Sequence, residues 1–96
     1  MRPYRVRDFY VPEVAMQGLH DYAAYGLQPG AFLTAVICND LVGACERGND
    51  ENLRNLPAFV SYLYAEAPPE CWGSKEKMKA WIAKMAEQRE LARSGR

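Results

Sequence analysis

The pattern of apolar and polar residues changes near residue 12 from a loose alternation to a helical spacing. Residues 1–11 alternate between charged and apolar or aromatic side chains, which predicts an extended N-terminal arm. Beyond Pro12, apolar residues recur every three to four positions, and a proline is tolerated in the first turn of a helix. This pattern predicts a first helix over residues 12–25, ended by Gly26 in the left-handed conformation.

Two further helical segments are predicted in the middle of the chain. The first covers residues 29–47 and again has a proline in its first turn. The second covers residues 50–67, but Pro57 within it cannot donate the backbone hydrogen bond of a regular helix. Either a short turn at residues 50–55 precedes a helix that starts at Leu56, or one kinked helix spans the whole segment.

The last helix is predicted over residues 74–92, after two consecutive prolines. Ser74 is a favourable N-cap residue for it. Four apolar side chains follow at the spacing that places them on one face: Met78, Trp81, Ile82 and Met85. The chain is therefore predicted to be all-α: a single domain over residues 1–96, folded as a compact bundle of about four short helices with an extended N-terminal arm.

The formal net charge of zero conceals an uneven distribution. Residues 1–7 carry a net +3, residues 8–73 a net −7 and residues 74–96 a net +4. Proteins dedicated to duplex DNA usually carry a basic excess, because neutralising phosphates supplies much of their affinity. The chain lacks that excess, although two basic ends that meet in space would still form a local patch.

Residues suited to catalysis or metal binding are few. The three cysteines lie seven and twenty-six positions apart and His20 is the sole histidine, which does not match the paired ligands of a structural zinc site. No serine or cysteine lies at a recognisable nucleophile elbow. We therefore expect no enzymatic activity, no metal and no cofactor. No apolar segment resembles a signal peptide or a membrane span, which predicts a cytoplasmic protein without membrane association.

Asp40 is the residue that fits least well into a simple helical core. If residues 29–47 form one helix, a helical wheel places Asp40 within the apolar stripe. A buried carboxylate needs strong partners, and Arg47 lies two turns further along on a similar side. Two interpretations stay open: Asp40 caps a helix or fixes the packing, or it faces a ligand or a partner protein across a partly open stripe.

The chain is rich in aromatic residues. Trp72 lies just before the predicted N-cap of the last helix, so it either closes the end of the bundle or, if exposed, serves as a binding hot spot. Tyr62 is predicted nearer the solvent face of its helix than Tyr64. Aromatic and arginine side chains of the arm could alternatively bind single-stranded nucleic acid by stacking and charge.

A partner-binding surface is predicted in the acidic middle of the chain. Its acidic members are Asp40, Glu46, Asp50, Glu51 and Glu66. Three other residues are also predicted to contact a partner, and they are Arg47, Tyr62 and Trp72. Such a surface could occupy a basic nucleic-acid groove on a target, where complementary charge accelerates association. A solvated acidic surface without a partner is the alternative.

Four segments of the chain resemble a group of small, mostly uncharacterised accessory proteins of temperate bacteriophages and prophages. In order within residues 18–84 they are GLQPGAFLTAVICNDL, NDEN, VSYLYAEAP and CWGSKEKMKAWI. Pro57 departs from the pattern of that group, in which an apolar residue is usual. The resemblance implies an accessory phage gene whose product acts in the bacterial cytoplasm, and it brings no catalytic residues with it.

These observations lead to two hypotheses about function. The first is a non-enzymatic phage protein that binds and inhibits or modulates a bacterial host protein or complex, with an anti-defence role such as anti-CRISPR inhibition as the specific form. A homodimer is compatible with this hypothesis. The second is a small nucleic-acid- or nucleotide-binding protein that uses the basic N-terminal arm and the lysine-rich last helix.

Overall fold

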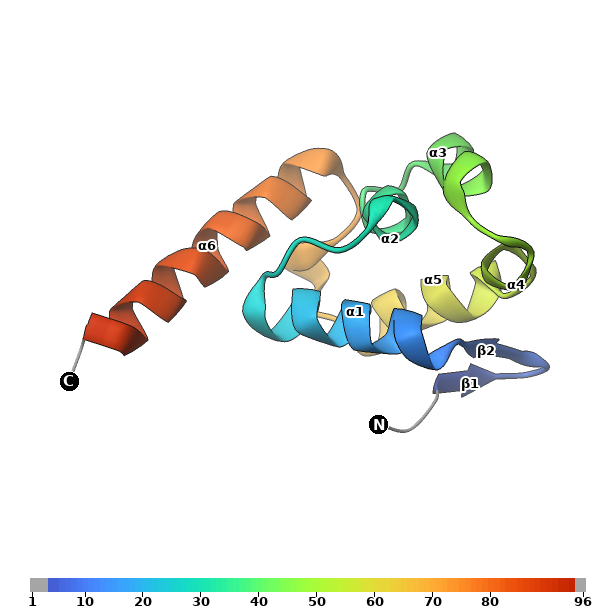
Figure 1. Ribbon diagram of the computed structural model, residues 1–96, viewed down its shortest axis with the longest axis horizontal. Helices are drawn as coiled ribbons and strands as arrows, with labels where there is room; N and C mark the ends of the chain where they lie inside the picture. Colours follow the sequence, from blue (N-terminus) through green and yellow to red (C-terminus); the bar gives the residue numbers. More distant parts are fainter. Residues whose placement is uncertain (1–3, 95–96) are drawn as a thin grey trace.

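The computed structural model describes residues 4–94 of the 96-residue chain (Figure 1). It begins with strands β1 (Tyr4–Val6) and β2 (Phe9–Val11), which form an antiparallel hairpin. Six α-helices follow within this part of the chain: α1 (Glu13–Tyr25), α2 (Ala31–Ile37), α3 (Leu41–Arg47), α4 (Asp50–Arg54), α5 (Leu56–Ala65) and α6 (Lys75–Ser94). A short 3-10 helix, η1 (Pro69–Cys71), lies between α5 and α6. The fold is therefore mostly helical, with one small sheet.

The core lies between α1, α2, α5 and the start of α6, and the hairpin packs against α5. The hairpin, four of the helices and η1 contribute large buried side chains to it, and these include Val11, Leu19, Tyr22, Ile37, Phe59, Leu63, Cys71 and Met78. Two hydrogen bonds satisfy polar groups inside it. The Tyr22 hydroxyl donates to the Cys71 carbonyl at 2.6 Å, and the Trp81 ring N–H donates to the Tyr22 carbonyl at 3.0 Å. These bonds tie α1 to both η1 and α6.

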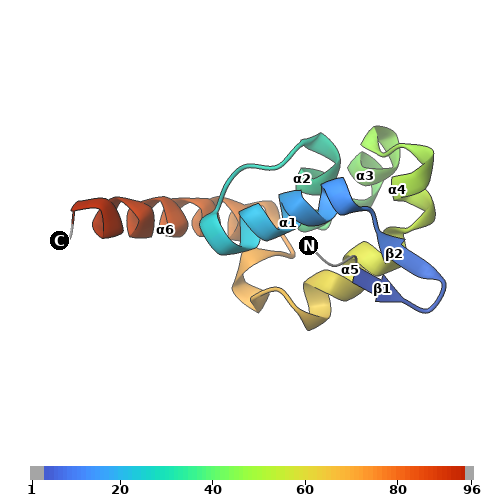
Figure 2. The same cartoon turned by 60° about the horizontal axis from the view of Figure 1, so that its bottom comes forward.

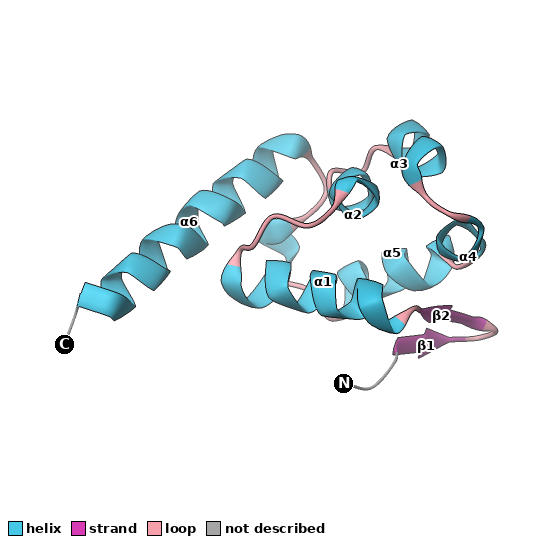
Figure 3. Cartoon of the chain, viewed as in Figure 1, coloured by secondary structure: helices cyan, strands magenta, loops and turns pink. Residues whose placement is uncertain are grey.

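The N-terminal segment forms a hairpin, so the predicted extended arm is wrong (Figure 3). The predicted all-α bundle of about four helices is confirmed only as a mostly helical fold, because residues 4–94 contain six α-helices and this hairpin. Tyr4 pairs with Val11 across the two strands, and Arg7 makes the turn with a φ of 54°. Both strands pack against α5, where the Tyr4 hydroxyl lies 3.0 Å from the Ser61 hydroxyl. The alternation in the sequence is thus that of a two-stranded sheet with one face covered by a helix.

The helix predicted over residues 29–47 is also wrong, because the structure divides it into α2 and α3. Asn39 adopts the left-handed conformation with a φ of 62°, which asparagine tolerates better than most residues. Its N–H donates to the Val36 carbonyl, and the Asp40 N–H donates to the Ala35 carbonyl at 2.8 Å. These two bonds form the usual ending of a helix at a left-handed residue, so α2 stops and the chain turns a corner.

The path near Pro57 follows the first of the two predicted alternatives. The short helix α4 ends before Asn55, and α5 starts at Leu56 with Pro57 in its first turn. Asn55 is only 2% exposed. Its side chain accepts from the Tyr10 N–H at 3.0 Å and donates to the Glu51 carbonyl at 2.9 Å. Asn55 therefore joins the outer edge of the hairpin to the corner between α4 and α5.

The first and last predicted helices are confirmed. Gly26 ends α1 with a φ of 70°, and the Ser74 side chain caps α6 by accepting from the Lys77 N–H at 3.1 Å. A Cβ on Gly26 would overlap the Cβ of Met85, so glycine allows the end of α1 to approach α6 closely.

The second half of α6 projects from the rest of the molecule (Figures 1 and 2). All side chains in residues 86–94 are exposed, and the longest dimension of the described chain is 46 Å. No helix in residues 4–94 combines the length and the apolar character needed to span a membrane.

Candidate functional site

Asp40 caps α3 and does not point into the core. Its Oδ1 accepts from the Gly43 N–H at 3.0 Å, and the residue is exposed. The wheel was wrong because α2 ends before Asp40, so the periodicity does not continue to it. The capping interpretation therefore describes its structural role. A Cβ on Gly43 would overlap the Asp40 carboxylate and lie 2.6 Å from an Arg47 guanidinium nitrogen, so glycine leaves room for both side chains.

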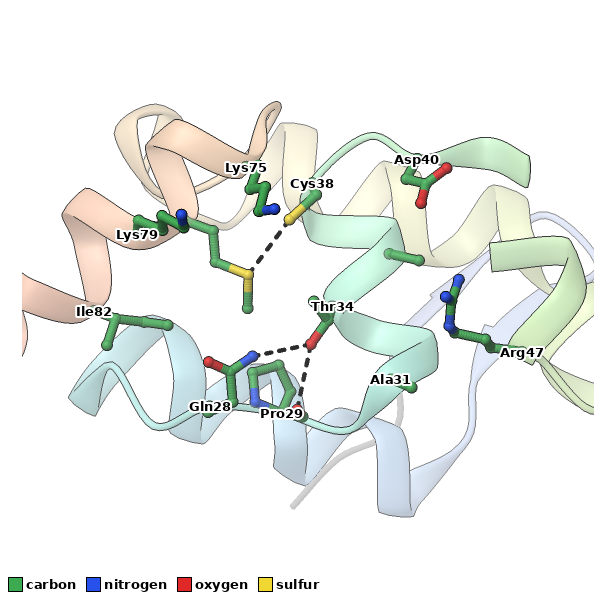
Figure 4. A pocket seen from close by; sticks show the side chains of 12 residues that line it. Gln28, Pro29, Ala31, Thr34, Cys38, Asp40, Arg47, Lys75, Lys79 and Ile82 are labelled. Atoms are coloured by element: carbon green, nitrogen blue, oxygen red, sulfur yellow. Dashed lines mark hydrogen bonds between the residues drawn. The ribbon is translucent and has the colours of Figure 1, made fainter. Parts of the chain in front are cut away.

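Asp40 and Arg47 line an open groove between α2 and α6 (Figure 4). The groove has a volume of about 680 Å³, within the range of roughly 300–1,000 Å³ typical of ligand sites. Its apolar floor includes the buried Ala35 and Met78 and the half-buried Ile82. The other lining residues are Gln28, Pro29, Ala31, Thr34, Cys38, Lys75 and Lys79. The groove is thus apolar in its depth and polar or charged at its rim.

The rim of the groove carries more positive than negative charge. Arg47, Lys75 and Lys79 are exposed, and none of them takes part in the ion pairs formed within residues 4–94. Asp40 is the single carboxylate among the lining residues. Because charges of one sign around a concave surface raise the local concentration of opposite charges, the groove favours anionic groups.

The thiol in the groove is not activated. Cys38 is half-buried, and its Sγ lies 3.5 Å from the Met78 sulfur. Burial raises the pKa of the Cys38 thiol, Asp40 raises it further, and Lys75 opposes the change. A cysteine with a raised pKa stays protonated near neutral pH and is a poor nucleophile. Within residues 4–94, no three His, Cys, Asp or Glu side chains are placed to hold a metal ion.

Comparison of the chain with protein-family models, curated proteins and solved structures finds no match in any of the three. The surface features of residues 4–94 with a defined lining include the groove, a hollow beside α1 whose lining carries both charges (Arg5, Glu13 and Glu51), and an apolar face of α5.

The predicted acidic surface is divided in the structure. Glu46 and Asp50 are exposed on α3 and α4, whereas Glu66 follows the last residue of α5, a helix of about 15 Å that starts next to α4. The Glu51 carboxylate accepts from the Tyr10 hydroxyl and so helps to hold the hairpin. Of the eight predicted contact residues, the groove brings together two, Asp40 and Arg47.

Tyr62 and Trp72 pack against the core and are half-buried. The Tyr62 ring lies edge-on to the Tyr4 ring, with centroids 5.5 Å apart. The prediction that Tyr62 lies nearer solvent than Tyr64 is wrong, because the unpredicted hairpin covers that side of α5. Tyr64 is 76% exposed instead.

The outward side of α5 forms an open, nearly flat apolar surface, which we call the α5 face. Val60 is 51% exposed and Tyr64 is 76% exposed on it. The residues that line it, none of them charged, are Leu56, Pro57, Val60, Ser61, Tyr64 and Ala65. The spacing of Pro57, Val60 and Tyr64 at i, i+3 and i+7 was the signal in the sequence that could have identified this face.

The two basic regions do not meet in the described part of the chain. Arg5 and Arg7 lie on the hairpin, and Lys75 and Lys79 lie on the first turns of α6, on the other side of the body in both views (Figures 1 and 2). The Arg5 guanidinium lies over the Tyr10 ring, 5.6 Å from its centroid. Arg2 lies outside the described residues.

Proposed function

We propose that this chain is a non-enzymatic protein of a bacteriophage or prophage that binds and inhibits or modulates a protein of the bacterial host. The observation that carries the proposal is the exposed, uncharged α5 face. Contiguous apolar surface on a soluble protein commonly marks an interaction site. Tyrosine is also enriched among the residues that dominate binding energy, and Tyr64 lies within this face.

The α5 face suits insertion of a preformed helix into an apolar groove of a partner. Pro57, Val60 and Tyr64 lie along one side of the helix, as the anchor residues of such complexes do. On its opposite side α5 is held by the buried Phe59 and Leu63 and by both strands. A helix already fixed in its bound conformation loses little conformational entropy on binding, so more of the contact energy contributes to affinity.

An inhibitor of this kind acts by occupying a surface, and it needs no reactive group. The resemblance to accessory phage proteins supports a target in the host cytoplasm, with host defence as the specific setting. The alternative, a nucleic-acid or nucleotide binder, has less support because the described cations of the hairpin and of α6 lie apart.

The test is capture of a partner from a bacterial lysate by the immobilised chain, followed by identification of the retained protein. We expect Val60→Glu with Tyr64→Glu to reduce capture about tenfold, because two charges would be desolvated in the contact. The matched control is Val14→Glu, which changes a valine that is 87% exposed on α1. Equal capture by the wild type and the α5 variant would contradict the proposal, as would retention of nucleic acid alone.

A further inference from the structure

The groove between α2 and α6 offers a chemistry that the α5 face lacks, because an apolar floor is combined with a cationic rim. We propose that this groove binds an acidic peptide segment of a partner protein, in which aspartate or glutamate residues are interspersed with aliphatic residues. The inference concerns a separate surface and does not depend on the α5 face.

The floor of the groove suits aliphatic side chains. Ala35 from α2 and Met78 and Ile82 from α6 form its apolar depth. Methionine adapts its shape readily, so it accommodates leucine, isoleucine or valine in several orientations. The twelve lining residues include no aromatic ring on which a nucleic-acid base could stack. A peptide with aliphatic side chains therefore fits this floor better than a single strand of nucleic acid.

The cations of the rim face the groove from two sides. Lys75 and Lys79 are one turn apart on α6, which places their Cβ atoms roughly 6 Å from each other. Arg47 reaches the groove from α3 on the opposite side (Figure 4). Its planar guanidinium can hold a carboxylate with two parallel hydrogen bonds, whereas the lysines act as point charges. Carboxylates spaced along a peptide can therefore find a partner on either wall.

Asp40 favours a peptide over a phosphate-bearing ligand. Its Oδ1 accepts from the Gly43 N–H, whereas its Oδ2 has no hydrogen-bond partner within residues 4–94. An extended peptide carries N–H groups that can donate to this second oxygen. A phosphate backbone has no such donor.

The test begins with selection of binders to the immobilised chain from a displayed library of random decapeptides. We expect enriched peptides that contain aspartate or glutamate together with leucine, isoleucine, valine or methionine. Lys75→Glu with Lys79→Glu should weaken binding of a synthetic enriched peptide about tenfold, because both changes reverse charges that attract it. Lys75→Gln with Lys79→Gln should weaken binding less. Enrichment of peptides without acidic residues, or no enrichment, would overturn the proposal.

Two controls separate this site from others on the molecule. Lys77→Glu changes a lysine on the same helix that does not line the groove, and it should leave peptide binding nearly unchanged. Val60→Glu with Tyr64→Glu should also leave peptide binding unchanged, although we expect this variant to reduce partner capture through the α5 face. Failure of the groove proposal is thus distinguishable from failure of the proposed function.

The alkylation rates of two native cysteines report where the peptide binds. Cys38 lines the groove and Cys45 is exposed on α3 outside it. We expect a saturating enriched peptide to slow alkylation of Cys38 by iodoacetamide at least about fivefold, with no change at Cys45, since a bound ligand restricts access to the thiol. Equal rates at Cys38 with and without peptide would overturn the proposal, as would protection of Cys38 by a single-stranded oligonucleotide in place of the peptide.

Discussion

The groove and the α5 face are built in different ways. The α5 face comes mainly from one helix, and its uncharged side chains follow the helical period. The groove needs α2, α3 and α6, and it joins residues from Gln28 to Ile82 around an apolar floor with a charged rim. A surface carried by a single helix survives small changes in the packing of the others. A surface shared by three helices depends on every corner that orients them.

The largest expected effect tests this dependence at the end of α1. Gly26→Ala places a Cβ against Met85, and it forces alanine into the left-handed conformation that only glycine adopts without strain. We therefore expect a loss of about 3 kcal/mol in the free energy of unfolding. Because Met85 lies on α6, peptide binding in the groove should fall more than capture through the α5 face. Chemical denaturation measures the first effect.

The control for Gly26→Ala is Gly30→Ala, where a Cβ would meet no atom within 4 Å. We expect this variant to remain within about 1 kcal/mol of the wild type, since Gly30 is only a weak N-cap. Equal losses in the free energy of unfolding for Gly26→Ala and Gly30→Ala would show that the close approach of α1 and α6 at Gly26 does not matter for stability.

The next largest expected effect concerns Asn55, which joins the hairpin to the start of α5. Asn55→Ala removes the hydrogen bonds to the Tyr10 N–H and the Glu51 carbonyl inside a buried site, so we expect a loss of about 2 kcal/mol. The hairpin and the α5 face should be affected more than the groove. Hydrogen exchange of the β2 amides measures the local effect on the hairpin, and thermal unfolding measures the loss of stability. Asn52→Ala is the control, because the Asn52 side chain forms no hydrogen bond within residues 4–94, and a comparable loss there would contradict the explanation.

The smallest effect separates the structural role of Asp40 from its charge. Asp40→Ala removes the cap of α3 and should lower the free energy of unfolding by about 1 kcal/mol. Asp40→Asn keeps an oxygen acceptor, so stability should stay close to that of the wild type. The amide nitrogen that replaces Oδ2 cannot accept from a peptide N–H, so binding of an enriched peptide should weaken. Calorimetry measures both quantities, and unchanged or stronger peptide binding by Asp40→Asn would contradict the role proposed for Oδ2.

Helices α1 and α6 could be predicted because their local signals agree. Each helix combines an apolar face with a residue that suits one of its ends. Gly26 ends α1, and Ser74 is the N-cap that begins α6. The hairpin carries weaker signals, because its turn has no glycine and Arg7 adopts the left-handed conformation there. Its alternation extends over only a few residues, and its stability depends on packing against α5, which no local pattern reports.

The division between α2 and α3 shows the limit of periodicity. Apolar spacing continues across Asn39 and Asp40, so a wheel treats the segment as one helix. The same two residues are also suited to end one helix and cap the next, and the structure uses them in that way. Pattern and capping chemistry disagreed at this point, and the capping chemistry described the fold correctly.

The candidate site was only partly predictable for a related reason. Asp40 and Arg47 were selected from the sequence, but through a helix that the structure does not contain. Nothing in the local sequence around Lys75 and Lys79 connects these two lysines with α2. Their shared groove results from the packing of α6 beside α2, which includes a bond from the Gly73 N–H to the Ile37 carbonyl at 2.8 Å.

The left-handed residue Asn39 has one more consequence. With the non-helical backbone of Asp40, it separates two seven-residue helices where one continuous helix over residues 31–47 would be about 25 Å long. The turn at these two residues brings α3 back beside α2, and so Arg47 lines the same groove as Ala35.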